Sequence, residues 1–202
     1  KAINESDMTL MPDCSTAVLD PFAAQTSLVV FCDVYEPLTG QPYARDPRSI
    51  ARSAEAYLKS SGIGDTAFFG PEAEFFVFDD VRYEVSMNRC FYEFESDEGP
   101  YQNGKVLEQG NHGHRPPIKG GYFPVAPVDG GGDLRAEMTT TMANMGLEME
   151  KHHHEVAPSQ HELGLKFSTL VRTADNMQIY KYVVHNVAHS YGKTATFMPK
   201  PI

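Results

Sequence analysis

Two glutamates, Glu72 and Glu74, lie two residues apart in a mostly apolar part of this chain. Residues 66–79 read Thr-Ala-Phe-Phe-Gly-Pro-Glu-Ala-Glu-Phe-Phe-Val-Phe-Asp, which predicts two short strands separated by Gly70-Pro71. Because residues i and i+2 of a strand share one face, both acids should point the same way and the apolar residues between them toward the core. The alternative is a half-exposed strand whose solvent face happens to be acidic.

A second pair of acids, Glu155 and Glu162, flanks the sequence Val-Ala-Pro-Ser-Gln-His. A turn over Ala157 to Gln160 predicts a hairpin in which Glu155 lies opposite Glu162. Directly opposed acids destabilise an antiparallel pair by roughly 0.2 to 1 kcal/mol, and a bound cation reverses that sign. Carboxylates on rigid strands suit Mg²⁺ or Mn²⁺, which bridge to phosphate oxygens, so phosphoryl transfer is the leading chemistry. The alternatives are another hairpin register, or solvated acids paired with Lys151 or Lys166.

Three adjacent histidines, His152 to His154, precede the first acid of that pair. In an extended run their side chains alternate, so His153 should point away from the other two, and all three cannot easily share one metal ion. We expect core packing or hydrogen bonding, with one imidazole lining the site on the side of Glu155. A metal-storage protein built on His and Glu is an alternative, and it would need no nucleotide.

The first third of the chain contains one predicted strand and one predicted helix. The run 27–33 is apolar and rich in β-formers, which predicts a buried strand. Prolines and a glycine between Pro37 and Pro47 indicate a linker, so we place a domain boundary near residues 44–46. After it, Asp46 can cap a helix that starts at Pro47 and ends at Gly62.

The rest of the chain mixes long irregular sequence with regular elements. Residues 96–132 show little periodicity and predict a long excursion of functional importance. A helix is expected from Asp133 to about Met145, a hairpin over 147–168, and a last helix from about Ala174 to Tyr191. Strands and helices do not alternate as βαβ units, which favours an α+β fold.

Composition excludes several classes of protein. The formal net charge of −10 disfavours nucleic acid as a partner. No apolar run approaches the roughly 18 to 20 residues of a membrane span, so we expect no membrane contact and a cytoplasmic location. The three cysteines are scattered and predict neither a disulfide framework nor a cysteine zinc site.

Several longer motifs, in this order along the chain, resemble bacterial type I glutamine synthetase. They are Asn4-Glu-Ser-Asp-Met8 with Met11-Pro-Asp13, Arg45-Asp-Pro-Arg48, Gly70-Pro-Glu-Ala-Glu-Phe-Phe76, Gly113-His-Arg-Pro116, Lys119-Gly-Gly-Tyr-Phe-Pro124, His152-His-His-Glu-Val156 and Lys193-Thr-Ala-Thr-Phe-Met-Pro-Lys-Pro201. The resemblance implies the end of an N-terminal β-grasp domain and linker at 1–45. The first part of the catalytic domain, a curved antiparallel sheet with flanking helices, would follow at 46–202.

The resemblance also implies roles for individual residues. Glu74, Glu155 and Glu162 would hold one divalent ion, Mg²⁺ or Mn²⁺, and Glu72 would belong to a second. Tyr122 and Glu155 would line the ammonium site. The residues implied in ATP binding are His153, Glu150, Leu165, Lys166 and Phe167.

The activity implied by the resemblance is the ATP-dependent ligation of ammonia to glutamate through a γ-glutamyl phosphate. The expected assembly is a homo-oligomer, a dodecamer of two hexameric rings with sites between subunits. Because the chain starts at Lys1 without a Met and stops at Ile202 without a tapering tail, we expect a partial chain that is inactive alone. The alternatives are a glutamate–amine ligase of the same superfamily and a structural relative without catalysis.

Overall fold

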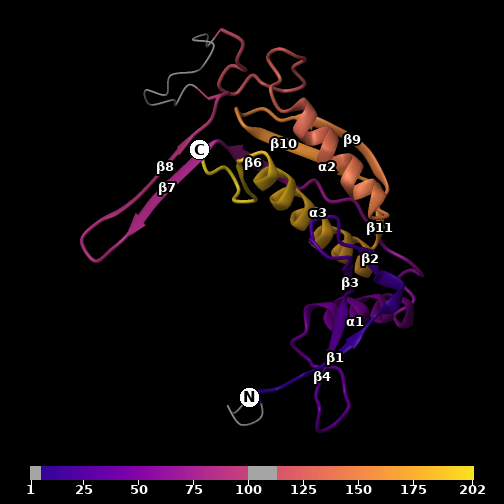
Figure 1. Ribbon diagram of the computed structural model, residues 1–202. Coiled ribbons are helices and arrows are strands. Elements are labelled where there is room, and N and C mark those ends of the chain that lie inside the picture. The colour runs from indigo at the N-terminus through magenta and orange to yellow at the C-terminus, as the bar shows by residue number, and fades with distance from the viewer. Residues whose placement is uncertain (1–5, 100–112) are drawn as a thin grey trace. The chain divides into compact units, whose positions relative to one another are not determined.

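A computed structural model describes residues 6–99 and 113–202 (Figure 1). Asn4 and Glu5 of the first motif, and residues 100–112 of the expected excursion, lie outside the described residues. The chain forms two compact units, Lys1–Gly70 with Phe167–Ile179, and Pro71–Lys166 with Tyr180–Ile202. Helices and antiparallel strands are mixed, which confirms the α+β class. No helix in the described ranges combines the length and apolar character that crossing a membrane requires.

The first unit is built from short antiparallel strand pairs, one complete helix and the first half of α3 (Leu170–Ser190). The pairs are β1 (Thr9–Pro12) with β4 (Cys32–Tyr35), β2 (Val18–Leu19) with β3 (Leu28–Val29), and β5 (Phe68–Phe69) with β11 (Ser168–Thr169). A single 3-10 turn, η2 (Cys14–Thr16), lies between β1 and β2.

The buried strand expected at residues 27–33 is wrong in two respects. The run splits into β3 and β4, because its two halves pair with different partners, β2 and β1. The residues of β4 are only half-buried, and Leu28 is 64% exposed, so β-propensity identified strand-forming residues but not one buried strand.

Helix α1 (Pro47–Ser60) confirms the prediction made from its capping residues. The Asp46 side chain accepts hydrogen bonds from the main-chain N–H groups of Arg48 and Ser49, and Gly62 follows the helix with φ of 71°. Burial does not explain this helix, since Ile50 and Tyr57 of its apolar stripe are 55% and 69% exposed.

Arg48 is the electrostatic centre of the first unit. Its guanidinium donates to both carboxylate oxygens of Asp175 at 3.0 Å, to Asp33 at 2.6 Å and to Asp13 at 2.7 Å. The side chain is 10% exposed, so one largely shielded cation holds three acids from separate parts of the sequence.

The second unit contains a four-stranded antiparallel sheet in the order β12-β6-β10-β9. Its strands are β6 (Glu74–Phe78), β9 (Met149–His154), β10 (Gln160–Leu165) and β12 (Thr194–Thr196). The strands β7 (Asp80–Val85) and β8 (Cys90–Glu95) form a hairpin that extends away from this sheet (Figure 1). The strands β7, β8 and β12 were not predicted from the sequence pattern.

Two helices, α2 (Gly132–Asn144) and the second half of α3 (Leu170–Ser190), cover one face of that sheet. On α3, the Tyr180 hydroxyl donates to the Ala73 carbonyl and accepts from the Leu163 N–H, while its ring lies 6.3 Å from Phe75. The core residues Met138, Met142, Val183, Val184 and Val187 are at most 1% exposed. The opposite face of the sheet is the one that these helices leave uncovered.

Both predicted helices are present, with small differences at their starts. Gly146 and Gly192 follow α2 and α3 at positive φ, as expected of residues that end helices. Helix α3 begins at Leu170 rather than near Ala174.

Candidate metal centre

Three neighbouring strands bring the predicted acids to one place. Glu162 on β10 pairs with Glu74 on β6, and on its other side it pairs with His153 on β9. Cross-strand partners share a face, and Glu155 lies two residues after His153 on the same side. All four side chains therefore project from the face of the sheet that the helices do not cover.

The hairpin register differs by two residues from the prediction that Glu155 lies opposite Glu162. The Glu155 N–H donates to the Gln160 carbonyl at 2.8 Å, and Glu162 pairs with His153. The turn is as long as predicted but spans residues 156–159 rather than 157–160; within it the Gln160 N–H bonds back to the Ala157 carbonyl and Ser159 adopts φ of 65°. A shift of two preserves the strand alternation, so both acids still share a face, as diagonal rather than direct neighbours.

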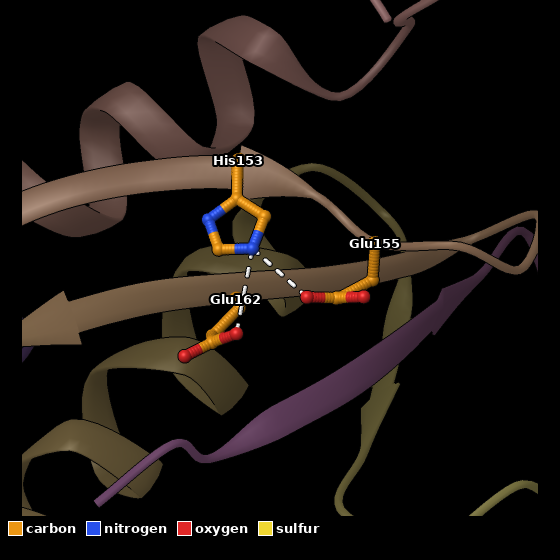
Figure 2. Close-up of side chains that lie close together, drawn as sticks. All are labelled: His153, Glu155 and Glu162. Carbon is orange, nitrogen blue, oxygen red and sulfur yellow. Dashed lines mark hydrogen bonds and ion pairs between the residues drawn. The ribbon is translucent and has the colours of Figure 1, made fainter. Parts of the chain in front are cut away.

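His153, Glu155 and Glu162 form a tight buried group (Figure 2). The His153 Nε2 lies 2.9 Å from Glu155 Oε1 and 3.4 Å from Glu162 Oε2, and one ligand atom from each residue lies within 4.8 Å of the others. The three residues are 3%, 8% and 7% exposed. Nitrogen and carboxylate oxygen atoms at this spacing form a donor set that could hold a metal ion.

Electrostatics in this group oppose two free negative charges. Burial, followed by the hydrogen bond and charge of Glu155 and the charge of Glu72, raises the pKa of Glu162, although His153 acts in the opposite sense. The His153 Nδ1 is buried and has no hydrogen-bond partner among the described residues. Buried like charges need a proton or a cation, so the group is suited to a bound positive ion.

The other two predicted ligands, Glu72 and Glu74, are exposed and stand beside this group rather than within it. Glu74 is paired with Glu162 across the strands, and its Oε2 accepts a hydrogen bond of 2.5 Å from the Gln160 amide. Glu72 precedes β6 and influences Glu162 only through its charge. Sequence reasoning missed Gln160, although its position two residues before Glu162 puts it on the same face.

The histidine triplet alternates as predicted. His153 faces the acids, and its ring meets the edge of Tyr122 at 5.6 Å and stacks on Phe123 at 4.6 Å. Tyr122 is 53% exposed, so the residue predicted for an ammonium site lies at the open edge of the group.

The segment that carries Tyr122 approaches the hairpin closely because residue 121 is glycine. The Gly121 N–H donates to the Val156 carbonyl at 3.0 Å. A Cβ at this position would lie 2.9 Å from Pro116 Cβ, 3.1 Å from Val156 O and 3.2 Å from His154 Cε1. Only glycine permits this approach without displacement.

Of the residues predicted to bind ATP, Glu150, Leu165 and Lys166 lie at the other end of the hairpin, where β9 begins and β10 ends, whereas His153 lies in the acid group. Glu150 and Lys166 are exposed, and Lys166 Nζ forms an ion pair of 2.6 Å with Glu148, which raises the pKa of the lysine. The Leu165 side chain is buried. Phe167 belongs to the other compact unit and packs edge-on against Phe68 at 5.4 Å.

A second polar cluster lies on the helix-covered face. Burial lowers the pKa of His161 to about 3, so this imidazole is neutral and can accept from Arg135 Nη1 at 3.0 Å. Arg135 is 2% exposed and forms an ion pair of 2.5 Å with Asp129. Sequence reasoning missed this cluster, which joins distant residues.

His154 belongs to the same face and is held in its charged form. Burial opposes the charge, but the hydrogen bond and charge of Glu98 raise the pKa of His154. Its Nε2 lies 2.8 Å from Glu98 Oε2, and its Nδ1 lies 2.6 Å and 2.9 Å from the carbonyls of Glu155 and Gly121. Because all three partners are acceptors, both ring nitrogens donate.

Comparisons with known proteins agree on one family. Residues 44–202 match the glutamine synthetase catalytic domain, and residues 1–37 match the glutamine synthetase beta-grasp domain. A glutamine synthetase of Azospirillum brasilense is 71% identical over 202 residues, which cover 100% of this chain and 43% of that protein. A Cupriavidus pinatubonensis protein named 3-hydroxylaminophenol mutase is 60% identical over 203 residues, with the same coverage of 100% and 43%.

A solved structure shows the same fold. The cryo-EM structure of Plasmodium falciparum glutamine synthetase superposes with a TM-score of 0.91 at 29% identity, covering 100% of this chain and 40% of that one. The chain therefore spans less than half the length of the proteins it matches.

Proposed function

The chain belongs to the glutamine synthetase family, and on that basis we propose that its protein ligates ammonia to glutamate at the expense of ATP. The terminal phosphoryl group of ATP would pass to the glutamate side chain to give γ-glutamyl phosphate, and ammonia would then displace phosphate to give glutamine. The observation that carries the proposal is the buried convergence of Glu155 and Glu162 on His153.

Divalent cations, Mg²⁺ or Mn²⁺, fit this group of side chains. Two buried carboxylates lie side by side against one imidazole, and carboxylate oxygens are the ligands that hard cations prefer. We assign Glu74, Glu155 and Glu162 to one ion and Glu72 to a second. When bound, the ions supply positive charge to the phosphoryl oxygens and to the carboxylate nucleophile, which otherwise repel each other.

The chain's own side chains shape the site around those ions. His153 donates to Glu155, which holds that carboxylate toward Glu162. We propose that Glu155 and the Tyr122 ring bind the ammonium ion, the first by charge and the second through its aromatic face. The half-exposed position of Tyr122 supports this, because the ammonium ion must enter the site from solvent.

Nucleotide binding is assigned to the far end of the hairpin. Glu150 and Lys166 are exposed there and available to a ligand, whereas Leu165 can contribute only its main chain. We also propose that Phe167 and His153 bind ATP, on the basis of the family resemblance. Because His153 also contacts Glu155, it would connect the phosphate end of ATP with the acids.

The larger organisation is also proposed from the family. Residues 1–45 would be the end of the β-grasp domain with its linker, and 46–202 the first part of the catalytic domain, which the ranges of the two family matches support. We further propose a cytoplasmic homo-oligomer, a dodecamer of two hexameric rings with its sites between subunits.

Glutamine formation by the complete protein tests the proposal. With glutamate, ATP and Mn²⁺, we expect ammonia-dependent release of phosphate and glutamine, and loss of both in Glu155→Ala and Glu162→Ala variants that still assemble. The same assay with methylamine or a polyamine in place of ammonia tests the alternative of a glutamate–amine ligase. An assay with 3-hydroxylaminophenol tests the activity in the name of the Cupriavidus relative. No glutamine from the parent protein, or unchanged turnover in both variants, would overturn the proposal.

A further inference from the structure

The segment that follows β8 clamps the turn of the metal-site hairpin. Glu98 Oε2 accepts from the Ser159 N–H and from His154 Nε2, each at 2.8 Å. Two residues before Glu98, the Ser96 hydroxyl lies 2.5 Å from the Ser159 hydroxyl. His154 ends β9 and Ser159 immediately precedes β10, so a single carboxylate oxygen joins the two strands where they turn.

The His154 imidazole connects this clamp to the acid group. Its Nε2 donates to the Glu98 carboxylate, and its Nδ1 donates to the Glu155 carbonyl at 2.6 Å. The main chain of Glu155 is thereby held on the helix-covered face, while its carboxylate projects from the other face toward Glu162. Ser159, at the other contact of the clamp, has a φ of 65°, a conformation that a non-glycine residue keeps only when its surroundings hold it.

Glu98 is an unexpected residue for a purely structural contact. Its side chain is 14% exposed, and its Oε1 is buried without a hydrogen-bond partner among the described residues. An unsatisfied buried carboxylate oxygen destabilises a fold and calls for a specific reason. The need to hold a turn against two repelling acids is such a reason.

We propose that Glu98 is a positioning residue that sets the main chain of Glu155, through His154 and Ser159, before a divalent cation binds. The inference rests on the proposed function in one respect, the identity of the ligand. Without the clamp, repulsion between Glu155 and Glu162 would be relieved by movement of the turn, and the cation would have to restore the geometry at the cost of affinity.

Variants of the complete protein test this. Glu98→Gln keeps the size of the side chain but removes its charge and can satisfy the two donors less well, and Glu98→Ala removes the clamp. Glu84→Gln is a matched control, because this acid pairs with Arg89 and Ser86 within the β7–β8 hairpin. Mn²⁺ affinity is measured by electron paramagnetic resonance, and hydrogen exchange of peptides spanning 154–160 is measured in metal-free protein together with the global unfolding midpoint.

We expect Glu98→Ala to weaken Mn²⁺ binding about tenfold and Glu98→Gln by a smaller factor, as for other residues that support ligands from outside the coordination shell. Exchange at Ser159 should accelerate in both variants, and Glu84→Gln should match the parent. A lower unfolding midpoint with unchanged Mn²⁺ affinity and unchanged exchange at 154–160 would overturn the inference. If Glu98→Ala does not fold, the same two measurements on Glu98→Gln decide.

The outcome is separable from that of the proposed function. If the parent makes no glutamine, but Glu98→Gln speeds exchange at 154–160 and weakens Mn²⁺ binding, the clamp inference stands and the ligase proposal fails. If the parent makes glutamine, but the Glu98 variants bind Mn²⁺ and exchange like the parent, only the clamp inference fails.

Discussion

Glu74 and Glu162 lie directly opposite each other across β6 and β10, the two central strands of the sheet. Each acid has its own polar neighbour, since the Gln160 amide donates to Glu74 and His153 Nε2 lies 3.4 Å from Glu162. Each acid therefore contacts one polar side chain, and the negative charge that the acids share has measurable consequences for stability.

Glu162→Gln should stabilise the metal-free protein and abolish its stabilisation by metal. Removal of one of two buried like charges relieves repulsion worth about 1 kcal/mol. In the parent, Mn²⁺ at a hundredfold excess over its dissociation constant should add about 2.7 kcal/mol, which the variant lacks. Thermal unfolding with EDTA and with Mn²⁺ measures both effects, with the exposed acid variant Glu148→Gln as control. A variant less stable than the parent in EDTA would contradict this account.

Gly121→Ala should disturb the open edge of the site. The new methyl group would meet Pro116, Val156 and His154 at 2.9 to 3.2 Å, so the segment must move and Tyr122 must move with it. We expect a loss of about 1 to 3 kcal/mol in stability and a higher KM for ammonia. At Gly132, the first residue of α2, a Cβ has no neighbour closer than 3.9 Å, so Gly132→Ala should leave both quantities nearly unchanged. Equal effects of the two substitutions would argue against the close approach as the cause.

Arg48→Met should destabilise the protein far more than Arg52→Met. Both arginines bind Asp13 and Asp33, but Arg48 is 10% exposed and also binds Asp175, whereas Arg52 is 46% exposed. Removing the largely shielded cation leaves uncompensated acids and should cost about 3 kcal/mol, against less than about 1 kcal/mol for the exposed one. Denaturant unfolding of both variants measures the difference.

Acid should remove a stabilising contribution that depends on Asp13. Hydrogen bonds, first from the Ser15 side chain and then from Arg48, lower the pKa of Asp13 in the folded protein. Above the unfolded pKa of about 3.9 the folded and unfolded states both carry the charge, and the contribution is complete. As pH falls below that value the unfolded state takes up the proton first, so the contribution is lost. The stability gap between the parent and Asp13→Asn should therefore be largest near pH 6 and narrow progressively as the pH falls below about 4.

Local sequence was enough for the elements whose signals lie within a few residues. Asp46 with Pro47 located the start of α1, and Gly146 and Gly192 located the ends of the later helices. Strand alternation together with a predicted hairpin was enough to place Glu155 and Glu162 on one face, with one histidine of the triplet beside them. Each of these signals comes from the local backbone geometry of a few neighbouring residues. None of them depends on contacts with distant parts of the chain.

Only the tertiary structure decided the hairpin register, the pairing of Glu74 with Glu162, and the contact of Glu98 with His154 and Ser159. The turn of this hairpin is contacted by Glu98, which lies 56 residues before His154 in the chain. The split of residues 27–33 between two strands likewise depends on which partners each half meets. The sequence by itself determined which side chains share a face, because alternation is local. Their neighbours depend on long-range pairing, whose energy is gained only when distant segments meet.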